Sequence, residues 1–399
     1  MRSTKHHHVA RKTVIRSCLT VVAFIMSVVA VSAATPRLCD SISSRLTIEL
    51  RPAYNIVKHY EFRNPNCSNL NTALSLHARY AFTLNDNSKT GKLYPTTYQG
   101  VGVAAYTFWN HERIGTPIAI YIFQGARLAD LGKEISIGYE WNFGASFGWR
   151  RNDAIGSPCN IYINMALPLT WRITPHWELS LTPDYTHFSD GDTLFPNSGV
   201  DMFGLRIGAT YLFDAEERRP SARGYLAASE SLSAQRTAQR MTYDVILYGG
   251  WRADRFFDDG EFCVINKPLP LGGAHFLPLY HLNDHFGIGA SLDIQVDSSL
   301  NLYDATKNEE GEVISYARPS LWQQTEVGIS LHGEIRAPIF AVGAGFGINI
   351  FRHGYDMSRF YTLFSLKTFI TKHLFLYVGY RYNSTQYTHN MMYGLGIRF

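Results

Sequence analysis

The chain alternates apolar and polar residues over segments of ten to seventeen residues, and this pattern restricts its fold more than any other feature. Successive side chains of a β-strand point to opposite faces, so such a segment forms a strand with one apolar and one polar face. Segments of this kind follow one another from about residue 45 onward. In the first half we expect strands near residues 46–61, 70–84, 96–110, 117–128, 133–150, 160–173, 176–189 and 199–213. The sequence therefore predicts an all-β protein, and eight strands are enough to close a barrel.

Composition indicates which face of this barrel is apolar. Aromatic residues make up 14% of the chain and charged residues 18%, yet the mean hydropathy is slightly negative, at −0.12. A transmembrane barrel gives such an average, because its outer face is apolar and its interior is polar. The connections near residues 84–94, 150–159 and 190–198 are longer than turns such as residues 173–176. Outer-membrane barrels place long loops outside the cell, so we predict an antiparallel transmembrane β-barrel with these loops on one rim.

The second half of the chain resembles the first. A polar stretch, residues 214–240, is predicted to be a linker between a first half at residues 34–213 and a second half at residues 241–399. We expect about eight strands in each half, and the second half reads as a degenerate repeat. The general likeness of all barrel strands is the alternative explanation. One larger barrel of sixteen strands is the simpler expectation, and two small barrels are the alternative. The repeated sequences are ITPH at residues 173–176 with ITKH at 370–373, and MFGLRI at 202–207 with MYGLGI at 392–397.

The first 33 residues have the pattern of a targeting segment. Basic residues between Arg2 and Arg16 precede an apolar run from Leu19 to Val31, and the small residues Ser32 and Ala33 follow. The run is too short for a membrane-spanning helix. We therefore expect residues 1–33 to be a cleaved signal peptide. The predicted location is the outer membrane of a Gram-negative bacterium.

Charge, cysteine and histidine content bear on a nucleic acid partner, a disulfide and a metal site. The net charge of +4 is too small to indicate a nucleic acid partner, and nothing indicates an oligomeric state. In an exported chain, Cys39 and Cys67 either form a disulfide or remain free thiols. His281, Asp284 and His285 have mixed spacing on a predicted turn, which favours a solvated rim over a metal site. We expect neither a metal nor a cofactor.

Three polar residues interrupt the apolar rows of two neighbouring strands. In the strand near residues 176–189 the odd positions are mostly apolar, but the row ends with His187 and Ser189. The odd row of the next strand is also apolar, but it begins with Asp201. Folding the hairpin symmetrically about residues 190–198 places Asp201 opposite His187, within two residues. The sequence therefore predicts three polar side chains that meet on the lipid-facing surface.

This combination of side chains is the one that nucleophilic ester cleavage requires. An imidazole takes the proton of a serine hydroxyl, and a carboxylate holds the imidazole in the required tautomer. His187 and Ser189 would lie about 7 Å apart at the backbone on one face of the strand. The backbone amides around Asp190 and Gly191 are the nearest donors for an oxyanion. Polar residues are also ordinary at the rim of a lipid-facing row, which is the structural alternative.

The sequence around these residues resembles a known family. YTHFSDGDT at residues 185–193, followed by PNSGVD at residues 196–201, resembles the signature of the PagL-type outer-membrane lipid A 3-O-deacylases. GYEWNFG at residues 138–144 and FGW at 147–149 resemble strands of longer relatives called acyloxyacyl hydrolases. The resemblance covers about residues 45–213, and the second half more loosely. It implies an eight-stranded barrel that removes an acyl chain from the lipid A of lipopolysaccharide. His187 would be the general base, Ser189 the nucleophile and Asp201 the orienting acid.

Two positions depart from the pattern of this family. The family usually has Asn after the serine, where it helps to bind the oxyanion, and here the residue is Asp190, whose carboxylate would oppose the developing charge. Asp201 stands in place of Glu, which shortens its reach. In the second half the corresponding residues are Ser384, Gln386 and Met391, so the chemistry is absent there. Two other functions stay open. One is an outer-membrane phospholipase A, which uses a His-x-Ser pair with Asn and calcium, and the other is an inactive barrel or pore.

Overall fold

The computed structural model describes residues 42–56, 71–84, 89–152, 154–214, 240–258, 261–354, 356–383 and 389–399. The predicted signal peptide, Cys39, Cys67 and nearly all of the predicted linker lie outside these residues. The chain divides into two compact units, one for each set of strands, and residues 191–195 are grouped with the second unit. No helix in the described part of the chain has the length and apolar character needed to cross a membrane.

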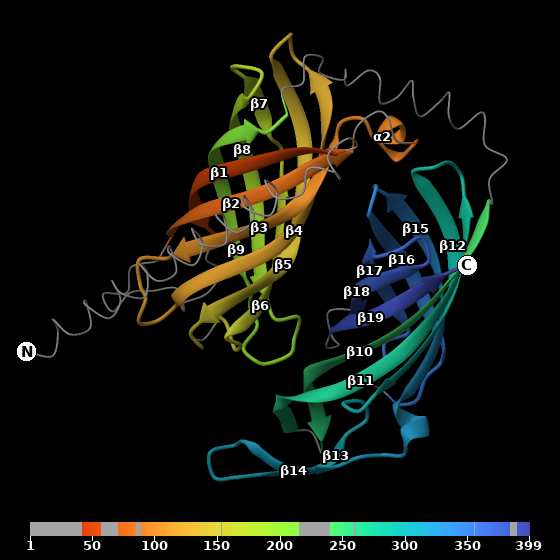
Figure 1. The fold of residues 1–399 in the computed structure, drawn as a ribbon. Coiled ribbons are helices and arrows are strands. Elements are labelled where there is room, and N and C mark those ends of the chain that lie inside the picture. Colours follow the sequence, from red (N-terminus) through yellow and green to blue (C-terminus); the bar gives the residue numbers. More distant parts are fainter. Residues whose placement is uncertain are drawn as a thin grey trace, which may run out of the picture. The chain divides into compact units, whose positions relative to one another are not determined.

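The first unit is a closed barrel of eight antiparallel strands, one of which is interrupted (Figure 1). β1 pairs with β2 on one side and with β9 on the other, and the pairing of β4 with β5 completes the ring. A short helix, α2 (Lys89–Leu93), lies between β2 and β3. The strands are β1 (Ile42–Asn55), β2 (Thr72–Leu84), β3 (Thr97–Thr107), β4 (Gly115–Asp130), β5 (Ile135–Trp149), β6 (Cys159–Ala166), β7 (Leu169–Arg172), β8 (Trp177–Ser189) and β9 (Val200–Leu212).

Pro168 divides the strand that we predicted at residues 160–173 into β6 and β7. The pairing with β5 keeps one register across the interruption, with Ala166 opposite Glu140 and Leu169 opposite Ile137. Proline has no backbone N–H, so the ladder loses one hydrogen bond there. The Pro168 carbonyl still accepts the Gly138 N–H at 2.9 Å. β6 and β7 therefore act together as the sixth strand of the barrel.

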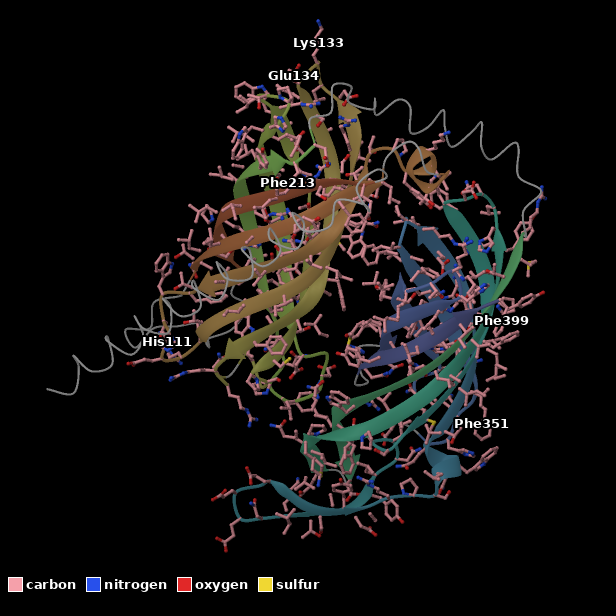
Figure 2. All side chains as sticks on the ribbon, viewed as in Figure 1. His111, Lys133, Glu134, Phe213, Phe351 and Phe399 are labelled. Carbon is pink, nitrogen blue, oxygen red and sulfur yellow. The ribbon has the colours of Figure 1, made fainter. Side chains whose placement is uncertain are left out.

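The connections of this barrel lie alternately at two rims. The connections after β1, β3, β5 and β8 share one rim, which we call the β8–β9 rim. His111 lies in a connection at this rim, whereas Lys133 and Glu134 mark the opposite one (Figure 2). The prediction that residues 84–94 share a rim with the other long connections is wrong, because β2 runs antiparallel to β5 and β8.

The barrel wall is apolar outside and polar inside. The odd residues of β8 and β9 face outward as predicted, for example Leu179, 42% exposed, and Phe203, 58% exposed. The even residues of the same strands face inward, and among them Asp184 and Arg206 are buried and charged. A soluble protein has the opposite arrangement, whereas a transmembrane barrel places apolar residues outside.

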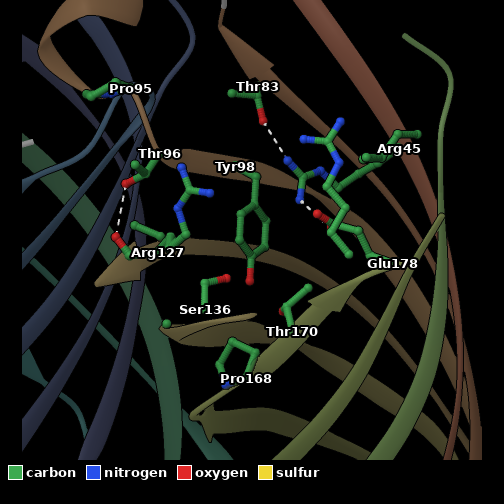
Figure 3. Close-up of a pocket in the computed structure, with 14 residues that line it drawn as sticks. Arg45, Thr83, Pro95, Thr96, Tyr98, Arg127, Ser136, Pro168, Thr170 and Glu178 are labelled. Atoms are coloured by element: carbon green, nitrogen blue, oxygen red, sulfur yellow. Dashed lines mark hydrogen bonds and ion pairs between the residues drawn. The ribbon is translucent and has the colours of Figure 1, made fainter. Parts of the chain in front are cut away.

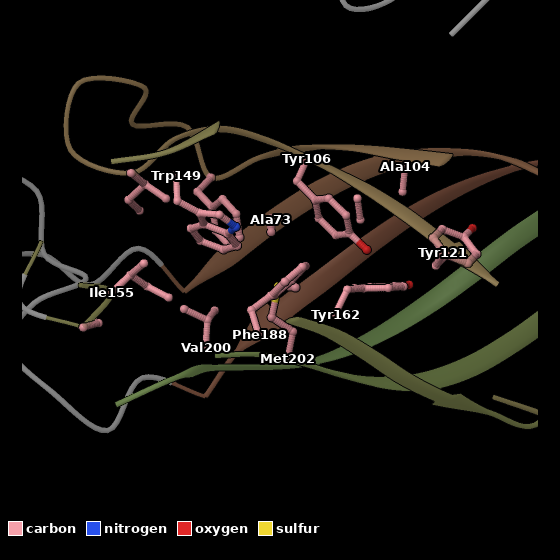
Figure 4. Packing of buried hydrophobic residues seen from close by; sticks show 14 of the residues in the cluster. Ala73, Ala104, Tyr106, Tyr121, Trp149, Ile155, Tyr162, Phe188, Val200 and Met202 are labelled. Atoms are coloured by element: carbon pink, nitrogen blue, oxygen red, sulfur yellow. The ribbon is translucent and has the colours of Figure 1, made fainter. Parts of the chain in front are cut away.

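An aromatic cluster fills the interior near the β8–β9 rim (Figure 4). Phe188 is fully buried in it, with ring centroids 4.9 Å from Trp149 and 5.2 Å from Tyr106. Because successive side chains of a strand point to opposite faces, the inward Phe188 directs His187 and Ser189 outward. Packing inside the barrel thus sets the orientation of the polar residues outside it.

The second unit is a separate closed barrel of eight antiparallel strands. Between β12 and β15 it carries a small hairpin, β13 (Tyr303–Lys307) and β14 (Val313–Ala317), and the 3-10 helix η2 (Leu321–Gln324). The barrel strands are β10 (Met241–Asp258), β11 (Glu261–His281), β12 (Phe286–Asp297), β15 (Thr325–Arg336), β16 (Phe340–Phe351), β17 (Phe360–Phe369), β18 (Leu374–Asn383) and β19 (Asn390–Arg398).

Two barrels replace the single larger barrel that we expected. The last strand of each set pairs with the first strand of the same set, β9 with β1 and β19 with β10. Each ring is therefore complete, and neither retains the free edge strands that a sixteen-stranded barrel would have to join. The expectation of one larger barrel is wrong.

The repeated sequences at residues 173–176 and 370–373 form the same turn in the two barrels. His176 Nδ1 donates to the Leu212 carbonyl oxygen at 2.9 Å, and His373 Nδ1 donates to the Arg398 carbonyl oxygen at 2.9 Å. Each bond joins the turn to the last strand of its own barrel. The likeness between the halves thus extends from sequence to hydrogen bonding at this turn.

Candidate active site

β8 and β9 bring His187 and Asp201 together on the outer face of the first barrel. The register pairs the two residues directly, as symmetric folding of the hairpin predicts. His187 Nδ1 lies 2.7 Å from Asp201 Oδ1, so Nδ1–H donates to the carboxylate and Nε2 is left as the acceptor. The shorter side chain of Asp201 therefore reaches the imidazole at an ordinary hydrogen-bond distance.

Ser189 lies beside this pair as the last residue of β8. It is two residues from His187 in the same outer row and stands opposite Ile161 of β6. Within the described part of the chain, no hydrogen bond joins Ser189 to His187. Catalytic hydrogen bonds are often long or poorly aligned before substrate binds, and rotation about the Cα–Cβ bond moves the serine hydroxyl. The structure thus forms the His–Asp pair and places the serine next to it.

Tyr185 is a further member of this group that the sequence did not reveal. Its hydroxyl donates to Asp201 Oδ1 at 2.5 Å, the same oxygen that accepts from His187. The Tyr185 ring packs against Phe203, with centroids 5.4 Å apart. The alternating pattern counts Tyr185 as one more apolar residue of the outer row, so no signal in the sequence pointed to its hydroxyl.

Gly199 provides the space in which the imidazole lies. Its φ is +72°, in the left-handed region that favours glycine. A Cβ at this position would lie 2.8 Å from His187 Cε1, well inside the normal contact distance between carbon atoms. The glycine belongs to the segment that resembles the family signature, but no role for it could be predicted. In the structure, a side chain at this position would collide with the histidine ring.

The predicted oxyanion donors are only partly available. The Asp190 N–H donates to Asn197 Oδ1 at 3.1 Å, so that amide already has an acceptor. Donation from this amide to an oxyanion stays a prediction and would require it to leave Asn197. The Gly191 amide stays a candidate, and Asn197 brings a side-chain NH₂ group beside the end of β8. The backbone of Asn197 is held by a β-bridge to Ile155.

Asp190 departs from the Asn that the family usually has at this position. It directly follows Ser189, the last residue of β8, and is only 5% exposed. A carboxylate opposes a developing oxyanion most strongly when the two are close, so the effect of Asp190 depends on its distance from the ester carbonyl.

Two cavities of the first barrel lie away from these residues. One of about 70 Å³ lies near the opposite rim and is lined by Arg45, Tyr98, Pro168 and Glu178, among others (Figure 3). A second, of about 50 Å³, shares these four residues and extends deeper into the barrel. Neither is lined by His187, Ser189 or Asp201, which belong to the outward rows of β8 and β9 and so face a substrate outside the barrel.

The other candidate residues form no comparable group. Among the described residues, no cluster of three His, Cys, Asp or Glu side chains could hold a metal ion. The expected solvated rim is wrong for His285, which is buried at the β11–β12 turn. In the second barrel, Ser384 and Gln386 lie outside the described residues, and Met391 is buried.

Comparisons with known proteins identify both halves of the chain. Residues 58–210 match the family model described as lipid A 3-O-deacylase (PagL), and residues 241–399 match the model described as acyloxyacyl hydrolase, C-terminal domain. A search of curated proteins gives no match.

Solved structures with some similarity include a surface protein, an attachment invasion locus protein and an outer membrane protein. Neisserial surface protein A is 13% identical, with a TM-score of 0.29, and 43% of this chain covers 99% of that one. Ail of Yersinia pestis is 9% identical, with a TM-score of 0.26, and the match covers 43% of this chain and 99% of Ail. Outer membrane protein Omp33 of Acinetobacter baumannii is 10% identical, with a TM-score of 0.17, and the match covers 90% of this chain and 98% of Omp33. These scores are low, and the fold assignment rests on the strand pairing.

Proposed function

The chain belongs to the PagL lipid A 3-O-deacylase and acyloxyacyl hydrolase family, and on this premise we propose that it is an outer-membrane esterase that removes an ester-linked acyl chain from lipid A. The observation that carries the proposal is the hydrogen-bonded pair of His187 and Asp201, with Ser189 beside it, on an otherwise apolar outer surface. A polar group of this kind on the lipid-facing side has direct access to a substrate that is itself a lipid.

The proposed reaction follows from the geometry of the pair. Asp201 holds the Nδ1–H of His187, so Nε2 takes the proton of the Ser189 hydroxyl as its oxygen attacks the ester carbonyl carbon. The Gly191 amide and the Asn197 side-chain amide are the donors we assign to the oxyanion. The intermediate then collapses, and His187 returns the proton to the departing sugar hydroxyl. Water cleaves the acyl-serine in the same manner and releases the fatty acid.

The proposed location follows from the surface of the first barrel. Its outward side chains are apolar, and the candidate site lies at the end of the apolar rows, at the β8–β9 rim. A lipid in the adjacent leaflet would present its ester bond near the β8–β9 rim. Its acyl chain would lie along the apolar rows that run toward the opposite rim. The first strand of this barrel, β1, begins at the opposite rim, and the last strand, β9, ends there. We assign this rim to the periplasmic side.

The interior of the first barrel argues against the alternative of a pore. Its buried arginines pair with buried carboxylates, with an Arg51–Asp184 distance of 2.5 Å and an Arg206–Glu140 distance of 2.8 Å. These pairs occupy the middle of the barrel, and the aromatic cluster around Phe188 fills the end near the β8–β9 rim. Water-filled channels need an open interior, which this packing leaves no room for.

A phospholipase A is the remaining enzymatic alternative. Its third catalytic residue is Asn, whereas here the carboxylate of Asp201 accepts the imidazole N–H. A carboxylate also stabilises the imidazolium that forms during the reaction, which a neutral amide does less well. The identity of the third residue therefore favours lipid A deacylation.

Lipid A analysis in a Gram-negative host that lacks its own deacylase tests the proposal. We expect the wild-type chain to remove one acyl chain from lipid A, as seen by mass spectrometry, and Ser189→Ala to leave lipid A intact. Ser180→Ala is a matched control, because Ser180 lies on the same strand but in the inward row. Intact lipid A with release of phospholipid fatty acids would identify the phospholipase instead. If neither lipid changes while the barrel is folded in the outer membrane, the proposal of an enzyme is wrong.

A further inference from the structure

Tyr185 lies next to the candidate site in the outward row of β8, on the side toward the opposite rim. The rest of this row on that side is apolar. The outward residues that precede it on β8 include Leu179, Leu181 and Pro183. A hydroxyl group that faces hydrocarbon without a partner is unfavourable, and this one donates to Asp201 Oδ1 at 2.5 Å. We propose that Tyr185 is a positioning residue, which acts on the reaction through Asp201. This inference rests on the proposed esterase function and adds a residue to its site.

Tyr185 and His187 donate to one and the same carboxylate oxygen of Asp201. They are two residues apart on one face of β8, so their side chains reach Asp201 from neighbouring positions of the same row. Two donors at Oδ1 fix the rotation of a carboxylate that has only two side-chain torsions. The oxygen that must face the imidazole is then held in place before substrate arrives, which is how preorganised sites avoid rearrangement during the reaction.

The backbone of Asp201 is already fixed by contacts that do not involve Tyr185. Asp201 pairs with His187 across β8 and β9, and on the other side its carbonyl oxygen accepts the Ile56 N–H at 2.8 Å. Tyr185 is therefore not needed to hold the main chain in position. Its hydroxyl acts on the side chain alone, and its removal should leave the strand pairing intact.

Asp201 is more buried than the histidine it holds. The Asp201 side chain is 15% exposed, whereas the His187 side chain is 32% exposed, although both belong to the outer row. Phe203 stands opposite Tyr185 and packs against its ring, which keeps the hydroxyl directed at Asp201. The rings of Tyr185 and Phe203 thus lie between the carboxylate and the apolar surface toward the opposite rim. Hydrogen bonds are stronger where little water is present, so this burial strengthens those from Tyr185 and His187 to Asp201.

Kinetics of Tyr185→Phe, which retains the ring and removes only the hydroxyl, tests this role. The full chain is refolded in detergent micelles, and fatty acid release from purified lipid A is measured. We expect kcat to fall about ten- to a hundred-and-sixtyfold, the range for loss of one hydrogen bond to a charged group, with KM little changed. Tyr211→Phe is the matched control, because Tyr211 lies in the same outward row of β9 near the opposite rim, and we expect it to retain wild-type kcat.

A double-mutant cycle with Asp201→Ala decides whether Tyr185 acts through the carboxylate. If it does, Tyr185→Phe has no further effect on the residual rate of the Asp201→Ala variant. The proposal is overturned if Tyr185→Phe retains wild-type kcat, or if it lowers the rate by the same factor in both backgrounds. The same cycle in urea unfolding measures the contact without any reaction. If coupling appears there but the wild type releases no fatty acid, the proposed esterase function fails, and the role of Tyr185 in it fails as well.

Discussion

Gly199→Ala should impair the candidate site while leaving the barrel folded. The added Cβ would lie 2.8 Å from His187 Cε1 and 3.1 Å from the Phe188 carbonyl oxygen. Carbon atoms in contact are about 3.5 to 4.0 Å apart, so the imidazole must move by roughly 0.7 to 1.2 Å. A shift of about 1 Å in a catalytic group lowers rates by up to about a hundredfold. We therefore expect kcat for fatty acid release from lipid A to fall about ten- to a hundredfold.

Backbone strain is the second effect of this substitution and needs a control. Alanine at a φ of +72° destabilises the folded chain by about 1–2 kcal/mol. Gly148→Ala introduces comparable strain at a φ of +93°, and its Cβ would meet the Thr116 carbonyl oxygen at 3.0 Å instead of the histidine. Urea unfolding should show similar losses for both variants, while only Gly199→Ala loses activity. Equal activity losses in the two variants, or wild-type kcat in a folded Gly199→Ala variant, would refute this reasoning.

Four further substitutions separate the roles of neighbouring residues. Asp201→Asn should lower kcat by about a thousandfold or more, because a neutral amide neither fixes the tautomer of the imidazole nor stabilises its charge; near-normal turnover would exclude the pair from the reaction. Asn197→Ala should lower kcat about a hundredfold with KM little changed, as expected for a lost oxyanion donor, and a change confined to KM would contradict that role. Asp190→Asn should change kcat by less than about threefold, because Asp190 is almost fully buried, whereas a large gain would mean that its charge opposes the oxyanion. Phe188→Ala should lower the free energy of unfolding by about 3–5 kcal/mol in urea titrations, since the fully buried ring packs against Trp149, and a loss below about 1 kcal/mol would show that the cluster does not stabilise the barrel.

Much of the candidate site could be predicted because it depends on local geometry. The outward direction of His187 and Ser189 follows from alternation along one strand, and the pairing of His187 with Asp201 follows from the adjacent hairpin. Neither inference requires knowledge of strands that are distant in the sequence. The length of the connection at residues 84–94 did not predict its rim, because the rim depends on the direction in which β2 runs.

Other members of the site were hidden because a residue type does not reveal its partner. Tyr185 fits an apolar row, and only the register between β8 and β9 brings its hydroxyl to Asp201. Gly199 reads as an ordinary loop glycine until the position of the His187 ring is known. Asp190 was expected beside the serine hydroxyl, but its burial and its amide bond to Asn197 depend on how the connection between β8 and β9 folds.

The sequence by itself determined the all-β class, the apolar outer face and the row on which the three polar residues lie. These features arise from the two-residue period of a strand, which is written in the order of the residues. Only the tertiary structure decided that the chain closes into two barrels, because closure depends on β9 pairing with β1 and β19 with β10, across most of each half. It also decided the contacts of Tyr185 and Gly199, since hydrogen bonds and close approaches depend on distances of a few tenths of an ångström that residue order does not specify.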